Sequence, residues 1–176
     1  MRRLISILAA GLLAGGTVLT SGMASAGTTA ARQPTCTPVG NVRLSVTSGG
    51  VTYYLGTRKT ASSGSPAILK AAQNATTLWA NIACPNGNLL ENGGLALTST
   101  ATSPGANVTL KAPGNGGTGF ASQQWFITIG CSTTPCHKWD FNDVKTALWL
   151  AIRSTGPVMG QTVTTGSAPT DWTHSP

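Results

Sequence analysis

Hydrophobic and polar residues alternate in short runs over most of this 176-residue chain, with a period near two rather than the 3.6 residues of a helix. Turn sequences such as Ser48-Gly49-Gly50 and Asn92-Gly93-Gly94 separate these runs. Short strands between such turns are typical of an all-β barrel or sandwich. The runs that predict strands are 43–47, 51–55, 95–98, 108–111, 125–129 and 148–153.

Helical spacing competes with alternation only between Phe141 and Ile152. Leu148, Leu150 and Ile152 alternate there with other residues, as they would on a strand that is half buried. We therefore interpret the end of this segment as a strand and predict no helix.

Tryptophan and cysteine recur with a period near 47 residues. Trp79, Trp125 and Trp172 are 46 and 47 residues apart, and Cys36, Cys84 and Cys131 interlock with them at spacings of 48 and 47. A period of this size indicates one supersecondary unit used repeatedly. We predict three repeats, at 36–83, 84–130 and 131–176, each with about four strands, which together form a closed twelve-strand body. The three tryptophans are expected to pack in its core.

The N-terminal sequence predicts an export signal. Arg2 and Arg3 precede an uncharged apolar run from Leu4 to Leu19, and Ala24-Ser25-Ala26 offers small residues for cleavage. The apolar run is shorter than the roughly 20 residues that span a bilayer, so no membrane insertion is expected. We predict a secretory signal peptide at 1–26, a flexible segment at 27–35, and a secreted, extracellular protein.

Charge excludes one class of partner. The formal net charge is +7, but the basic residues beyond the signal peptide are scattered, without the cluster or stripe that a nucleic-acid partner requires. We expect no nucleic-acid partner and no cofactor.

Export makes the four cysteines candidates for disulfides first. Cys131 and Cys136 enclose the turn sequence Ser-Thr-Thr-Pro, and pairing them leaves Cys36 with Cys84, which would join the first two repeats. A metal site would need Cys131, Cys136 and His137, but its cysteine spacing and missing fourth ligand argue against zinc. No metal is predicted.

The middle repeat carries a resemblance to a known family. Its elements are Gly94-Leu95-Ala96-Leu97, then the segment from Gly105 to Leu110, then Gln123-Gln124-Trp125. In this order they resemble ricin-type β-trefoil lectin domains, whose repeats end in Gln-x-Trp. The other repeats carry degraded forms, Thr77-Leu78-Trp79 and Thr170-Asp171-Trp172. The resemblance implies a β-trefoil fold and non-catalytic binding of a glycan or polysaccharide.

The family's sugar-binding residues are almost all replaced. Carried over by position, the aspartate of the family's pocket falls at Gly56, Thr98 and Ala151, the aromatic platform at Lys70, Lys111 and Thr164, and the Asn-Gln pair at Thr76-Thr77, Ser122-Gln123 and Pro169-Thr170. Only Gln123 matches. The resemblance therefore supports the fold and argues against the family's galactose-type pocket.

Four residues remain candidates for ligand binding: Gln123, Trp139, Trp149 and Tyr54. Each also has a structural interpretation. Gln123 is able to tie neighbouring backbone, and Tyr54 and Trp149 are able to fill the space of a disulfide that the family has and this chain lacks. Trp139 is expected in an insertion after the Cys131–Cys136 turn, either as a binding element or packed under the barrel.

Catalysis is not expected. The carboxylates Glu91, Asp140, Asp143 and Asp171 have no spacing that places two of them face to face, as a glycosidase needs. His174 lies near the end of the chain, and no Gly-x-Ser-x-Gly motif accompanies the histidines. The alternative function is a β-trefoil protease inhibitor or protein-binding module, which would present the Cys131–Cys136 loop to a protein partner.

Overall fold

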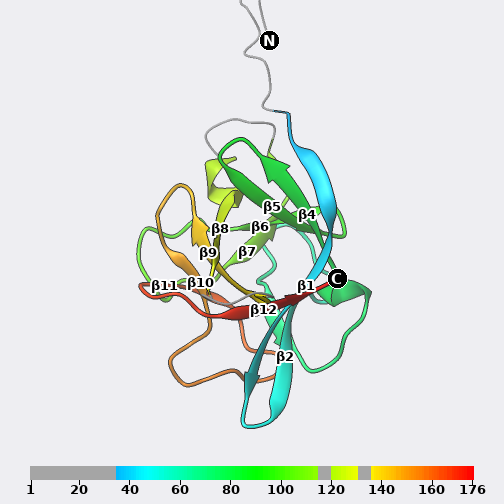
Figure 1. The fold of residues 1–176 in the computed structure, drawn as a ribbon, viewed down its shortest axis with the longest axis vertical. Coiled ribbons are helices and arrows are strands. Elements are labelled where there is room, and N and C mark those ends of the chain that lie inside the picture. The colour runs from blue at the N-terminus through cyan, green and yellow to red at the C-terminus, as the bar shows by residue number, and fades with distance from the viewer. Residues whose placement is uncertain (1–34, 115–119, 131–135) are drawn as a thin grey trace, which may run out of the picture. The chain divides into compact units, whose positions relative to one another are not determined.

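A computed structural model describes residues 35–114, 120–130 and 136–176 of the chain (Figure 1). The signal peptide predicted at 1–26 lies outside the described residues. The strands are β1 (Thr37–Ser48), β2 (Val51–Gly56), β3 (Ile68–Lys70), β4 (Trp79–Cys84), β5 (Gly87–Asn92), β6 (Leu95–Thr98), β7 (Thr109–Lys111), β8 (Trp125–Ile129), β9 (Lys138–Asp143), β10 (Trp149–Ala151), β11 (Thr164–Gly166) and β12 (Trp172–Ser175). Two short 3-10 helices, η1 (Ala75–Thr77) and η2 (Ala121–Gln123), precede β4 and β8.

Six strands form a closed antiparallel ring. β1 pairs with β4, β4 with β5, β5 with β8, β8 with β9, β9 with β12, and β12 returns to β1. β1 is long enough to pair with two neighbours in succession. Its first half lies along β4 and its second half along β2 (Figure 1). A closed ring has no unpaired edge strand. This agrees with the closed body that the repeat pattern predicts.

The other six strands form three hairpins, β2–β3, β6–β7 and β10–β11, one in each four-strand repeat. Three backbone hydrogen bonds join them in a cycle. Ala67 N–H donates to the Val108 carbonyl, Val108 N–H to that of Val163, and Val163 N–H to that of Ala67, each at 2.9 Å. All three residues are fully buried. The chain therefore has the all-β β-trefoil fold, with three repeats of four strands.

The three periodic tryptophans occupy equivalent places at the start of β4, β8 and β12. Trp79, Trp125 and Trp172 are fully buried. Each indole N–H donates to a carbonyl oxygen of the same repeat, at Leu55 (3.0 Å), Leu97 (3.1 Å) and Leu150 (3.0 Å). A buried indole N–H needs such a partner, so each tryptophan contributes both apolar area and a fixed orientation.

The segment 141–152 contains strands, as its alternation predicts. It holds the end of β9 and all of β10, separated by a turn in which Ala147 adopts a φ of 56°. The carboxylate of Asp143 stabilises this turn by accepting hydrogen bonds from the backbone N–H groups of Lys145 and Thr146. No helix in the described part of the chain is long and apolar enough to cross a membrane.

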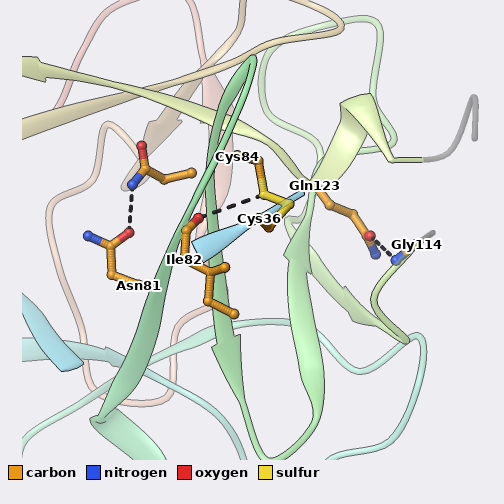
Figure 2. The surroundings of a disulfide bond; sticks show 7 residues. Cys36, Asn81, Ile82, Cys84, Gly114 and Gln123 are labelled. Carbon is orange, nitrogen blue, oxygen red and sulfur yellow. Dashed lines mark hydrogen bonds between the residues drawn. A yellow bond between two sulfur atoms is a disulfide. The ribbon is translucent and has the colours of Figure 1, made fainter. Parts of the chain in front are cut away.

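A disulfide joins Cys36 and Cys84, with the Cα atoms 4.3 Å apart (Figure 2). Cys36 precedes β1 and Cys84 is the last residue of β4, so the bond closes the two ends of the first repeat. The predicted pairing of Cys36 with Cys84 is confirmed. The predicted Cys131–Cys136 pairing involves residue 131, which lies outside the described residues.

Candidate functional site

Strand register defines which residues of the three hairpins are equivalent. Gly56 pairs with Ile68, Thr98 with Thr109, and Ala151 with Thr164. Ile68, Thr109 and Thr164 are therefore equivalent. The residues two positions after them, Lys70, Lys111 and Gly166, are equivalent as well. The prediction that Thr164 takes the third aromatic-platform position was wrong by two residues, because only the register, and not the sequence spacing, aligns the loops before β11.

The first repeat fills its pocket with its own side chains. The Lys70 ammonium group donates to Thr76 Oγ1 at 2.7 Å and to the Thr57 carbonyl at 3.3 Å. A Cβ atom at Gly56 would lie 2.8 Å from the Thr76 carbonyl oxygen and 2.9 Å from Lys70 Cδ. No side chain fits at Gly56, so the family's aspartate has no room here.

A 3-10 turn holds this closed arrangement in place. Asn74 caps η1, its side chain accepting from Thr76 N–H while the Thr77 hydroxyl accepts from Asn74 N–H. The Thr76 carbonyl, in turn, accepts from Thr57 N–H at 2.9 Å. The loop before β4 is thereby fixed against the end of β2.

The second repeat uses Gln123 for the same purpose. Its Oε1 accepts from Gly114 N–H at 2.6 Å (Figure 2). Its Nε2 donates to the Ala112 carbonyl at 2.9 Å and to Thr98 Oγ1 at 3.2 Å. The side chain is only 3% exposed. Since these bonds occupy both amide hydrogens and the oxygen, Gln123 ties the loop after β7 to β6 and has no donor left for a sugar.

The third repeat lacks the turn that closes the other two. Ala168 and Pro169 are equivalent to Ala75-Thr76 and Ala121-Ser122, yet no 3-10 helix forms there in the described structure. A proline disfavours helical dihedrals in the residue before it, so Pro169 prevents Ala168 from starting a turn. The bonds from Thr57 N–H to Thr76 and from Ser99 N–H to Ser122 have no counterpart between Ile152 and Pro169 among the described residues.

A hollow of about 690 Å³ lies where that turn is missing. Residues 151–155, 164–170 and 104–105 line it. Ser154, Thr155 and Ser167 are exposed hydroxyls of this lining, and Arg153 is its one charged residue. No aromatic side chain and no carboxylate stands among these described lining residues. Its polar groups are hydroxyls, backbone groups and one guanidinium, and the lining also contains apolar residues, namely Pro104, Ala151, Ile152, Ala168 and Pro169.

Tyr54 and Trp149 occupy equivalent strand positions in different repeats, so they do not form one site. Tyr54 pairs with Lys70, and Trp149 with Gly166. Both side chains are partly buried, and the Tyr54 hydroxyl accepts from Gln73 Nε2 at 3.0 Å. The hollow of the third repeat includes neither residue.

Trp139 lies on β9 rather than in a loop insertion, which corrects the expected position. It is partly buried against the core, stacks on His174 with ring centroids 3.8 Å apart, and meets Phe141 edge-on at 6.1 Å. The alternation of β9 turns Trp139 and Phe141 toward the same face, which explains the contact. The loop required by the protease-inhibitor alternative, at 131–135, lies outside the described residues.

The carboxylates of the third repeat are held in different environments. Asp140 is 7% exposed, and its pKa is raised by burial and by the charge of Asp171, against an opposing effect from Lys138. Burial also raises the pKa of Asp143, although hydrogen bonds from Thr146 lower it. Asp171 is exposed and forms an ion pair with Lys138 at 3.1 Å. Burial likewise raises the pKa of Glu91, on β5 of the second repeat.

Comparison with known proteins supports the fold. No family model and no curated protein sequence matches this chain. Among solved structures, the chain is similar to the designed three-fold symmetric protein ThreeFoil, with a TM-score of 0.64, 19% identity, and coverage of 76% of this chain and 96% of that one. This likeness establishes the β-trefoil fold.

Two further structures are similar to this chain. A Polyporus squamosus lectin bound to a human-type influenza-binding epitope gives a TM-score of 0.58 at 15% identity, and the lysenin pore gives 0.53 at 12% identity. They cover 77% and 81% of this chain, respectively, and this chain spans about half, 48%, of each of theirs. At these identities the likeness extends to the fold.

The open hollow is the feature that sequence reasoning missed. Its signals were present in Pro169, which stands where the other repeats have Thr76 and Ser122, and in Gly166, which stands where they have Lys70 and Lys111. Pro169 was noted as a departure from the family's sugar site, but Gly166 was passed over because Thr164 was placed at the third platform position. Their combined effect is the larger hollow of the third repeat, about 690 Å³ against about 360 Å³ in the first, and it becomes evident only beside the η1 and η2 turns of the other two repeats.

Proposed function

We propose that this protein is a secreted, non-catalytic carbohydrate-binding module whose ligand enters the hollow of the third repeat. The observation that carries the proposal is the missing 3-10 turn at Ala168-Pro169, which opens a hydroxyl-lined hollow where Lys70 and Gln123 close the other repeats. The lectin among the similar folds supports this function. The Cys36–Cys84 disulfide is compatible with an extracellular location.

The lining explains which sugars are favoured. Sugar hydroxyls form hydrogen bonds with hydroxyl and backbone groups, and Ser154, Thr155 and Ser167 offer them at the surface. Since the described lining holds no aromatic platform, each contact with a single sugar is expected to be weak. Ligands with several sugar units are therefore favoured over free monosaccharides.

The test is retention of the protein on insoluble polysaccharides and cell-wall preparations. Ser167→Leu places an apolar side chain in the hollow and is expected to abolish retention. Ser63→Leu, at an exposed position of the first repeat outside the described hollow linings, serves as the matched control and should be retained like the parent protein. Failure of the parent protein to bind any polymer, with its circular dichroism spectrum intact, would contradict the proposal.

A further inference from the structure

Two arginines occupy equivalent positions in the first and third repeats. Arg58 follows Gly56 by two residues and Arg153 follows Ala151 by two, and strand register makes Gly56 and Ala151 equivalent. Each arginine also begins the same kind of turn. The Arg58 carbonyl accepts from Ala61 N–H at 3.1 Å, and the Arg153 carbonyl accepts from Gly156 N–H at 2.9 Å. The second repeat has Thr100 in this place.

Each arginine stands in the lining of a hollow. Arg153 lines the hollow of the third repeat, and Arg58 lines a smaller one of about 360 Å³ in the first repeat, outside the space that Lys70 fills. The two linings share equivalent positions, because Thr57 matches Ile152 and Ala75 matches Ala168. Both arginines are exposed.

Charge makes both hollows suited to anions. Neither described lining contains a carboxylate, and Lys59 adds a second cation to the smaller hollow. The one ion pair found in the described residues, Lys138–Asp171, involves no residue of either lining. Arg153 donates one N–H to Thr162 Oγ1 at 3.3 Å, which is one of the five N–H groups of its guanidinium. A guanidinium matches the geometry of carboxylate and of comparable oxyanions such as sulfate.

We propose that the protein binds an anionic polysaccharide at both hollows, with Arg58 and Arg153 each contacting an acidic group of the polymer. This inference rests on the carbohydrate-binding function proposed above. Two weak sites on one rigid domain gain affinity when a single polymer occupies both, since the second contact becomes intramolecular. Such avidity compensates for the absence of an aromatic platform.

Equilibrium dialysis with trigalacturonate measures the number of sites. The parent protein is expected to bind two molecules per chain, Arg58→Gln and Arg153→Gln one each, and the double variant none. Lys111→Gln removes an equal charge from an exposed position outside the described hollow linings and should leave two sites. An unchanged number of sites in the single arginine variants would overturn the inference.

Polymers then separate this inference from the proposed function. Polygalacturonate should bind about 10²- to 10⁴-fold more tightly than the trimer, and either arginine substitution should remove most of that gain. The fully methyl-esterified polymer keeps the same backbone without charge and is expected to bind at least about tenfold more weakly. Dextran sulfate against dextran shows whether sulfate replaces carboxylate.

Each pattern of results has one meaning. Equal binding of the charged and esterified polymers overturns the anionic inference and leaves carbohydrate binding intact. No binding of charged or neutral polymers overturns both proposals. Weaker binding of polygalacturonate at higher salt is expected, because exposed charge pairs are screened.

Discussion

The first and third repeats share one backbone plan but differ in what lies at the end of their hairpins. In the first repeat, η1 and the Lys70 side chain close the space beside Gly56. In the third repeat, Pro169 prevents that turn, glycine replaces the lysine, and a hollow of about 690 Å³ remains. The barrel tolerates both outcomes because the difference lies in loops at its surface.

What the two repeats have in common is the core. The cycle of hydrogen bonds among Ala67, Val108 and Val163 and the bonds from the tryptophan indoles are nearly identical in length around the three-fold arrangement. Interactions that all three repeats make thus define the fold, while the turn that the third repeat lacks determines where the larger hollow lies.

Removing a periodic tryptophan should have the largest effect, and it should be alike in both repeats. Trp79→Ala and Trp172→Ala each leave a cavity and an unpaired carbonyl, so each is expected to lower the free energy of unfolding by about 3–5 kcal/mol. Urea unfolding measures this. A cost below about 1 kcal/mol for Trp172→Ala alone would show that the third repeat is not held by the common core.

Enlarging the residue at the end of the second strand should distinguish the closed repeat from the open one. Gly56→Ala drives a Cβ to 2.8 Å from the Thr76 carbonyl oxygen and is expected to cost about 1–3 kcal/mol. Ala151→Ser, at the equivalent position beside the hollow, is expected to cost less than about 1 kcal/mol. Comparable costs from the two substitutions in thermal unfolding would argue against the difference in packing.

The lysine of the closed repeat should contribute measurably to stability. Lys70→Met keeps the apolar stem but loses the bonds to Thr76 and Thr57, for an expected cost of about 0.5–1.5 kcal/mol. Lys111→Met, at the exposed equivalent position, is the control and should remain within about 0.5 kcal/mol of the parent protein. A neutral Lys70→Met would indicate that η1 closes the pocket without the lysine.

The smallest expected effect is the change in stability with pH. The third repeat contains three of the four Asp and Glu residues, and the first repeat contains none. Burial raises the pKa of Asp140 and of Asp143, so the folded protein holds these protons more tightly than the unfolded chain does. The free energy of unfolding should therefore increase as the pH falls from 7 toward about 4, the ordinary range of aspartate.

Asp140→Asn should flatten this dependence, because its neutral amide does not titrate. Urea midpoints for the parent protein and the variant between pH 4 and 7 provide the measurement. Asp171→Asn, at an exposed position, is the comparison and should change the slope less. An identical slope in the parent protein and Asp140→Asn would assign the dependence to other groups.

Much of the fold was predictable from the chain alone. The spacing of Trp79, Trp125 and Trp172 and the alternating runs indicate three repeats of four strands, because a packed core requires the same large side chain at the same place in each repeat. The predicted runs correspond to β1, β2, β6, β7, β8 and β10, and the other six strands were not predicted. In β9, the charged residues Lys138, Asp140 and Asp143 interrupt the alternation that Trp139 and Phe141 carry.

The candidate site was less predictable. Tyr54, Trp139 and Trp149 were candidates because aromatic side chains often contact sugars. Each lies on a different strand, and the register of that strand fixes its position. Gln123 matches the family's motif, yet its amide is used within the protein. The type of a residue shows which interactions its side chain is able to make. Neighbours that are distant in sequence determine whether the side chain is free to make them with a ligand.

The chain alone was enough to predict the three repeats, six of the twelve strands and the buried tryptophans, since these follow from local periodicity and from the need to bury apolar surface. The folded structure was needed to show that the third repeat has the larger hollow and that Arg58 and Arg153 line hollows at equivalent positions. Those features arise from pairings between strands and loops far apart in the chain, which no local pattern specifies.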